Sequence, residues 1–345
     1  MVLLACMFPL IWLGGLVTST GAGMSVPDWP NTYGYNMFAV PWDIWLGENA
    51  GGIFHEHSHR LLASFVGMLA IGVAGLAWWK EPRRWVRWVA YSTLMAVCVQ
   101  GLLGGLRVIW VSLDLAVIHG IFGQLTFCLA GLLVLAQTKW WHRATQQTPT
   151  GRPGHIWWAG VLTVVIVVQL VVAASMRHYG AGLAVPDWPL HFGGVLPPVS
   201  EDGLRQANQV RAFDYFLGPV SLGEVWLHMA HRLIAYGICG LALIVAAKVW
   251  KTGRLRGHTA FLIVLVGVQV SLGVLTIWMS KPADIATLHQ ATGALTLLTS
   301  FILTARGWVI FRSPVGASMA AEAVILEAAD EEAAQAETPA VVGVR

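Results

Sequence analysis

The stretch GAGMSVPDWPNTYG at residues 21–34 returns as GAGLAVPDWPLHFG at residues 180–193, and nine of the fourteen positions are identical. Three shorter matches follow the two copies in the same order, namely residues 56–61 with 228–233, 100–104 with 269–273, and 119–123 with 289–293. Self-similarity at a fixed spacing indicates a repeated structural unit. We therefore interpret the chain as a tandem duplication.

The composition indicates a membrane protein, because 56% of the 345 residues are hydrophobic, 11% are charged and the mean hydropathy is +0.64. A helix needs about 20 apolar residues to cross the hydrocarbon core. We expect eight such helices, at residues 2–19, 55–79, 85–110, 114–137, 156–176, 224–247, 258–279 and 285–305. The fold class is thus an all-α membrane protein with eight transmembrane helices. Four helices per repeat give both repeats the same orientation, so we expect two parallel tandem four-helix bundle repeats.

The repeat also predicts how the chain is divided. Residues 1–137 form the N-terminal four-helix half and residues 156–312 the C-terminal half, with a cytoplasmic linker at 138–155 between them. The first apolar segment has no basic leading region and no cleavage site, so we interpret it as a helix rather than a signal peptide. Residues 313–345 are rich in alanine and acidic residues, which predicts a flexible cytoplasmic tail.

Basic residues lie on one side of the predicted membrane. Thirteen of the 21 Lys and Arg residues fall in the second, fourth and sixth loops or just after the last helix: Lys80, Arg83, Arg84, Arg87, Lys139, Arg143, Arg152, Lys248, Lys251, Arg254, Arg256, Arg306 and Arg312. The loop at 20–54 has none. Because cytoplasmic loops are enriched in Lys and Arg, we expect both termini in the cytoplasm and a multi-pass location in the inner (plasma) membrane. The net charge of +3 reports this topology and gives no reason to expect a nucleic-acid partner.

Four histidines, His59, His119, His231 and His289, lie inside predicted spans near their outer ends. Ionisable residues in the bilayer are costly, which makes each of them a candidate functional residue. A single membrane histidine more often makes a hydrogen bond between helices. Four in duplicated register instead favour two pairs, each at one depth, that ligate a haem iron from opposite faces.

Neighbouring residues extend this hypothesis. Arg60 and Arg232 each follow a histidine directly, where a guanidinium can pair with a haem propionate, although ordinary snorkelling of a basic side chain explains them too. His55 and His59 are spaced i,i+4, which leaves a zinc or copper site on one helix face as an alternative. We expect most of the remaining histidines to lie in solvated loops or at helix ends.

The two repeats differ at one position that matters chemically. The N-terminal half has Glu56 three residues before its histidine, where the C-terminal half has His228. At i,i+3 the carboxylate shares a helix face with His59, so it can take an acid/base role beside a bound haem. An acid that simply stabilises the start of a helix is the alternative. The difference suggests one reactive half and one carrier half.

These residues together resemble the haem A synthase family: ExxHR at 56–60, HxxHR at 228–232, His119, His289 and the duplicated GAGxxVPDWP loop. The resemblance covers about residues 10 to 310. It implies an enzyme that oxidises the C8 methyl group of haem O to a formyl group in two successive steps, giving haem A for terminal oxidases. It further implies that His231 and His289 hold a resident haem b, while His59 and His119 frame the haem O site with Glu56.

The resemblance also suggests partners and shows one departure. It suggests haem O synthase and terminal oxidase assembly factors as partners within the lipid bilayer. It is compatible with either a monomer or an oligomer. Many bacterial relatives carry a cysteine pair in the outer loops, whereas the loop 20–54 has no cysteine, so a thiol-dependent step lacks support here. The tryptophans of the outer loops are candidates for lids over the haem pockets, although interfacial anchoring explains them equally well.

Two other functions fit parts of the pattern. A di-haem transmembrane cytochrome b that transfers electrons would explain four histidines but not the replacement of histidine by Glu56. A haem exporter or chaperone would bind haem without oxidising it. Haem extraction from cells with and without the gene separates these functions from haem A synthesis.

Overall fold

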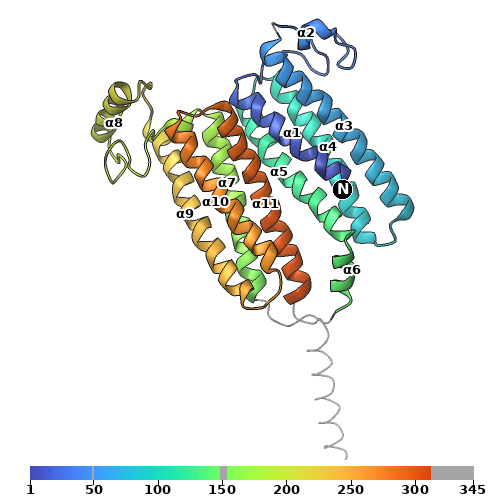
Figure 1. Ribbon diagram of the computed structural model, residues 1–345. Coiled ribbons are helices and arrows are strands. Elements are labelled where there is room, and N and C mark those ends of the chain that lie inside the picture. The colour runs from blue at the N-terminus through green and yellow to red at the C-terminus, as the bar shows by residue number, and fades with distance from the viewer. Residues whose placement is uncertain (49, 148–153, 312–345) are drawn as a thin grey trace, which may run out of the picture.

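The computed structural model describes residues 1–48, 50–147 and 154–311, and within these ranges the regular elements are all helices (Figure 1). The elements are α1 (Val2–Ser19), α2 (Trp42–Leu46), α3 (Gly51–Lys80), α4 (Arg84–Ile109), α5 (Leu113–Ala136), α6 (Lys139–Thr145), α7 (Gly154–His178), η1 (Ala181–Leu183), α8 (Glu201–Asp214), α9 (Leu222–Trp250), α10 (Arg256–Trp278) and α11 (Ala283–Phe311). The predicted tail at 313–345 lies outside the described residues.

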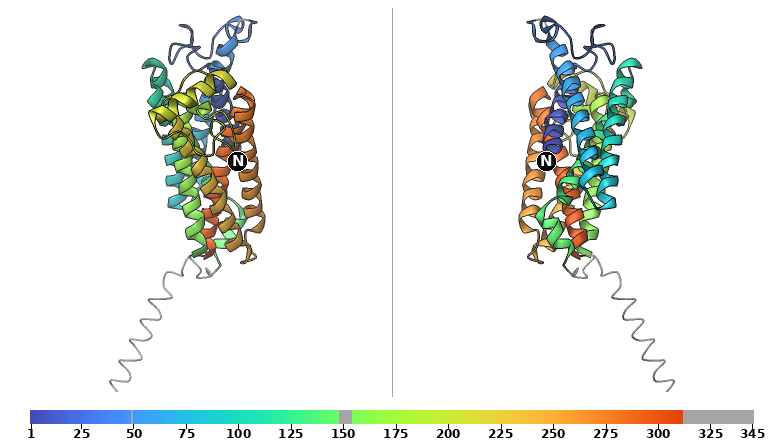
Figure 2. Two further views of the ribbon diagram at one scale, coloured as in Figure 1. Left: turned by 90° about the vertical axis from the view of Figure 1, so that its left-hand side faces the viewer. Right: turned by 90° about the vertical axis from the view of Figure 1, so that its right-hand side faces the viewer.

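The long helices form two groups that stand side by side, as Figure 1 shows. The N-terminal group consists of α1, α3, α4 and α5, and the C-terminal group of α7, α9, α10 and α11. The groups meet where α1 and α5 pack against α11 and where α5 packs against α7. Side views show the helices running nearly parallel along one long axis (Figure 2). We call the end that carries α2 and α8 the loop end.

Eight helices among the described residues are long and apolar enough to cross a membrane, which confirms the predicted number. Several run beyond the predicted spans, because the sequence criterion stops at the last apolar residue whereas a helix continues through polar turns. Helix α3 starts at Gly51 rather than 55, and α11 covers Ala283–Phe311 rather than 285–305. His59 therefore lies about 12 Å along α3 from its first residue.

Three shorter helices lie in segments that the sequence reading treated as loops: α2, α6 and α8. Side-chain caps account for two of them, because Thr138 accepts a hydrogen bond from Trp141 N in α6 and Ser200 accepts one from Gly203 N in α8. Capping also starts the long helix α9, where Ser221 and Glu224 form a capping box.

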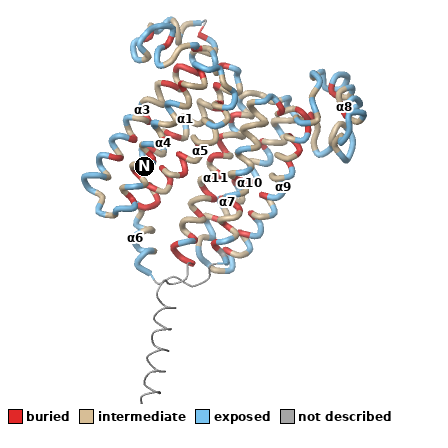
Figure 3. The backbone as a smooth tube through the Cα atoms, turned by 180° about the vertical axis from the view of Figure 1, so that it is seen from behind, coloured by how far each residue is buried: buried red, intermediate tan, exposed pale blue. Residues whose placement is uncertain are grey.

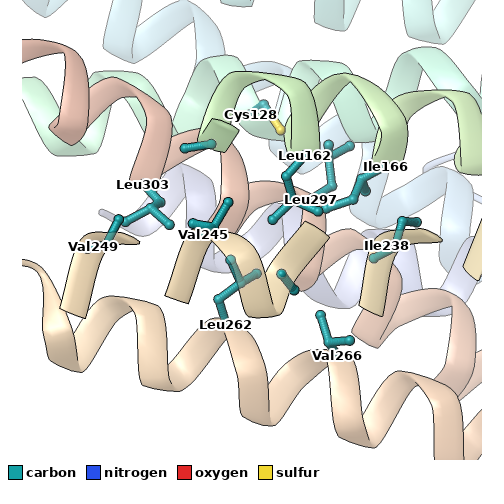
Figure 4. Close-up of a cluster of buried hydrophobic side chains, with 12 residues drawn as sticks. Cys128, Leu162, Ile166, Ile238, Val245, Val249, Leu262, Val266, Leu297 and Leu303 are labelled. Atoms are coloured by element: carbon teal, nitrogen blue, oxygen red, sulfur yellow. The ribbon is translucent and has the colours of Figure 1, made fainter. Parts of the chain in front are cut away.

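Apolar packing joins the helices of the C-terminal group. Side chains from four different helices lie close together in one buried cluster in the close-up of Figure 4, namely those of Leu162, Val245, Leu262 and Leu297. Each of these four residues is at most 1% exposed. Cys128 from α5 belongs to the same cluster, so the core continues across the boundary between the two groups. Because lipid tails are as apolar as these side chains, close van der Waals packing rather than exclusion of water holds the helices together here.

The outward faces of the helices are exposed along their length (Figure 3). Many of the exposed side chains are large and apolar, among them Trp78, Met95, Val164, Leu243 and Val264. Exposed apolar surface on this scale marks an interaction surface. On eight apolar helices it is the surface that faces lipid.

The two copies of the repeated loop have the same backbone conformation. Asp28 accepts hydrogen bonds from the N–H groups of Tyr33 and Gly34, and Asp187 accepts the matching pair from Phe192 and Gly193. Both copies contain a cis Trp-Pro bond and an isolated β-bridge. Burial raises the pKa of Asp28, but the N–H groups of Gly34 and Tyr33 and the charge of Arg60 outweigh burial and lower it.

We predict that Asp28→Asn destabilises this loop, because an amide oxygen can replace only one of the two carboxylate acceptors. One backbone N–H then loses its charged partner, at a cost of about 1–3 kcal/mol. The apparent unfolding midpoint in detergent should fall by several degrees, and hydrogen exchange at Tyr33 and Gly34 should accelerate. Asp43→Asn, on an exposed acid of α2, is the control and should leave both unchanged. Exchange at Tyr33 and Gly34 that is as slow in the Asp28→Asn variant as in the wild type would contradict the proposed role of the Asp28 carboxylate.

Candidate functional site

Arg60 holds the first repeated loop against α3. Its Nη1 donates to the carbonyls of Asp28 (2.6 Å) and Asn31 (3.0 Å). Its Nη2 donates to the carbonyl of Val26 (2.9 Å) and to Glu56 Oε1 (2.8 Å). The two Nη atoms carry four N–H donors, so these four bonds account for all of them.

Arg232 does the same for the second loop. Its Nη2 donates to the carbonyls of Val185 (2.9 Å) and Asp187 (2.7 Å), and its Nη1 lies 3.4 Å from the carbonyl of Leu190. These three positions match Val26, Asp28 and Asn31 in the repeat. The structure thus gives both arginines a role that the sequence did not suggest: they satisfy loop carbonyls. Their pairing with haem propionates stays a prediction.

Glu56 and His228 also occupy equivalent places. Glu56 Oε2 accepts a hydrogen bond from Val26 N (3.0 Å), and His228 Nδ1 accepts one from Val185 N (3.3 Å). The two side chains are 3% and 2% exposed. Both therefore anchor the loop to the helix, and only Glu56 adds a buried ion pair with Arg60.

Each of the four predicted iron ligands has a half-buried side chain at an interface between helices. In three of them, His59, His119 and His231, the Nδ1 atom is buried without a hydrogen-bond partner. An unsatisfied buried polar atom is rare and calls for an explanation such as an ion. These rings have a nitrogen available for a ligand.

The C-terminal pair has a geometry that suits a haem iron. The ring centres of His231 and His289 are 6.3 Å apart and their planes are inclined by 68°. Two imidazoles that bind one metal ion from opposite sides, with bonds of about 2 Å each, place their ring centres about 6 Å apart. His289 Nδ1 lies 3.1 Å from the carbonyl of Gln269, and such a second hydrogen bond orients a metal-bound imidazole.

Glycines and glutamines position the rings, and sequence reasoning gave them no role. A Cβ atom on Gly104 would lie 3.2 Å from Cε1 of His119, and one on Gly273 would lie 3.2 Å from Cε1 of His289. Gln100 Nε2 donates to the carbonyl of His119 (3.1 Å). The repeated Gln-x3-Gly spacing was the available signal, because it places a polar group and a gap on one helix face.

In the N-terminal group, the ring of His59 lies against Gly14 of α1, where a Cβ atom would be 3.0 Å from Cε1. In the C-terminal group the rings of His231 and His289 come together, as the repeat predicted. The pairing of His59 with His119 stays a prediction, and so does the service of all four histidines as iron ligands.

Two expectations about the other histidines need correction. His57 is buried, 1% exposed, and lies 3.2 Å from Thr32 Oγ1. His258 is bonded to the carbonyl of Thr299 and contacts Arg306. Both lie on helices, where a neighbouring loop or helix covers them. The zinc or copper alternative at His55 and His59 finds no further ligand, since the described part of the chain contains no group of three or more His, Cys, Asp or Glu side chains.

Comparison with known proteins agrees with this geometry. Residues 1–302 match the model of the family described as cytochrome oxidase assembly protein. Relatives named "Heme A synthase" include those of Beijerinckia indica, 28% identical over 84% of this chain and 86% of the relative, and of Hyphomonas neptunium, 28% identical over 86% and 89%. The relative of that name from Brucella ovis is 26% identical over 83% and 84%. The chain belongs to the cytochrome oxidase assembly protein family.

Proposed function

We propose that this protein is a haem A synthase, an oxidoreductase that converts haem O to haem A. The family and the relatives named "Heme A synthase" support this function. The observation that carries it within the molecule is a difference between the two halves beside their half-buried histidines: the equivalent loop N–H is bonded by the carboxylate of Glu56 in one half and by His228 in the other. A protein that only transfers electrons has no need of that difference.

We further propose that the two halves divide the work. In the C-terminal half, residues 156–312, His231 and His289 would hold a resident haem b, which the 6.3 Å separation of their rings supports. When bound, haem b supplies electron transfer. In the N-terminal half, residues 1–137, His59 and His119 would orient haem O so that its methyl group faces the chain's own acid/base group.

Glu56 is the proposed acid/base group for the oxidation of the C8 methyl to a formyl group in two successive steps. Its carboxylate is buried, and Oε1 lies 2.8 Å from the guanidinium of Arg60. Oxidation of a methyl group releases protons, which a carboxylate at this place can accept, and the first repeated loop bonds that carboxylate through Val26 N. The repeated loop would then both exclude water and hold the base in place.

The direct test is haem extraction from cells that make haem O, with and without this gene. Haem A should appear only with the gene. Haem O that stays unchanged in the presence of folded protein would leave an electron-transfer or haem-carrier protein as the function.

We predict that His231→Ala and His289→Ala each remove most of the resident haem and its low-spin spectrum, because each variant deletes one of two axial ligands. The matched variants His59→Ala and His119→Ala should retain that spectrum and lose haem O binding. Absorbance of the purified proteins measures both. A full low-spin spectrum in both C-terminal variants would place the resident haem elsewhere.

We predict that Glu56→Gln lowers conversion of haem O to haem A by roughly 10²-fold or more, the usual scale for a positioned acid or base. Glu56→His is the sharper variant, because the chain itself uses histidine at the equivalent position to bond the loop. It should keep the loop and the resident haem while also losing conversion. The reciprocal His228→Glu should perturb the spectrum of the resident haem more than it lowers conversion. Normal conversion by Glu56→His would show that Glu56 only anchors the loop.

We also propose that the protein lies in the inner membrane with both termini in the cytoplasm and works beside haem O synthase and oxidase assembly factors. Lys80 in the last turn of α3 and Lys248 in the last turn of α9 lie opposite the loop end, which supports this orientation. A reporter fused after Arg345 should be active in its cytoplasmic form. Activity of a periplasmic reporter at the same position would reverse the orientation of both haem sites.

A further inference from the structure

A basic pocket lies at the loop end of the molecule, where α1, the α4–α5 connection and α7 meet. Its volume is about 270 Å³, and its lining includes Arg107, Arg177 and His178 together with Thr18 and Ser112. None of the twelve lining residues is an aspartate or glutamate. Its volume is below the roughly 300–1,000 Å³ of pockets for whole drug-sized ligands, so it suits one arm of a larger ligand.

Arg107 links this pocket to the N-terminal histidine pair. It lies three residues after Gly104, whose backbone packs against the ring of His119, so it occupies the same face of α4 about one turn nearer the loop end. Arg107 Nη2 donates to the carbonyl of Gly23 (2.8 Å). Among the described residues Arg107 takes part in no ion pair within 4.0 Å.

Arg177 closes the opposite wall of the pocket. Its Nη2 donates to the carbonyl of Gly15 and to Ser19 Oγ, both at 2.6 Å, and its Nη1 bonds to Gln290. These bonds fix the guanidinium between α1 and α11. Arg177 likewise has no carboxylate partner in the part of the chain that the structure describes. Two half-buried guanidinium groups, neither of them in an ion pair within 4.0 Å among the described residues, create a favourable site for an anion.

The nearby carboxylates are already engaged. Glu56 pairs with Arg60, and Asp114 bonds to the hydroxyl of Tyr179. The pocket also lacks a duplicate, since Thr276 matches Arg107 in the repeat and Thr18 matches Arg177. The positive charge is therefore particular to this pocket and is not a feature common to both halves.

We propose that this pocket binds a propionate carboxylate of the haem O substrate, with Arg107 as its principal partner. The inference rests on the proposed function and deepens it. A haem held at His59 and His119 needs a cation for its carboxylates, and the Nη donors of Arg60 are used by the loop. Arg107 is the cation that lies on the loop side of His119 with its guanidinium in a pocket. A guanidinium also recognises carboxylates through charge-assisted hydrogen bonds.

The test compares binding of haem O and of its dimethyl ester, in which both carboxylates are neutral, to the purified full-length protein containing its resident haem. Absorbance titrations are made on the wild type, Arg107→Gln and Arg205→Gln, whose guanidinium is exposed on α8 beside Asp202. Esterification should weaken binding to the wild type about 10-fold or more, the scale of a lost charged hydrogen bond. Arg107→Gln should weaken haem O binding to a similar extent and respond little to esterification. Arg205→Gln should behave as the wild type.

Equal affinity of the wild type for haem O and its ester would overturn the proposal without needing any variant to fold. A loss of co-purified anionic phospholipid in Arg107→Gln, with unchanged haem O binding, would assign the pocket to a lipid phosphate and overturn it too. Failure of the proposed function is a separate result. The wild type would then still bind haem O more tightly than its dimethyl ester, but no haem A would form in cells.

Discussion

The hydrogen bonds from Arg60 and Arg232 to the carbonyls of the repeated loops are the interaction on which the site depends. Each arginine adjoins a predicted iron ligand, so the loop and the histidine are fixed to the same turn of one helix. A buried loop must satisfy its carbonyls, and a buried guanidinium must satisfy its donors. The loop carbonyls therefore accept the hydrogen bonds that the arginine must donate, and the loop covers the end of the bundle above the histidine.

The same scaffold carries different chemistry in its two copies. Glu56 and His228 bond the same loop N–H, so the loop does not require a carboxylate at that position. The carboxylate in the N-terminal copy adds a negative charge beside Arg60, and Arg107 adds a positive charge one turn beyond Gly104. The C-terminal copy has a histidine and Thr276 at these places, so it has neither the added carboxylate nor the added guanidinium.

The sequence predicted the eight helices and the two histidine pairs because both follow from patterns within one chain: apolar length and the register of a repeat. It did not predict the partners of Arg60 and Arg232, since a side chain that bonds a loop 30 residues away leaves no local pattern. The early start of α3 was missed because the helix begins with two glycines, and the polar residues His55, Glu56 and His57 interrupt the apolar pattern soon after them. The pocket at Arg107 and Arg177 joins helices from both halves and has no repeated motif to reveal it.

The central claim is that the two histidine pairs hold different haems. A cryo-electron microscopy map of the protein with its resident haem and added haem O tests it most directly, because the long alkyl tail of haem O distinguishes it from haem b. The account predicts the tailed haem between His59 and His119 and the tail-less haem between His231 and His289. The tailed haem between His231 and His289 would contradict it.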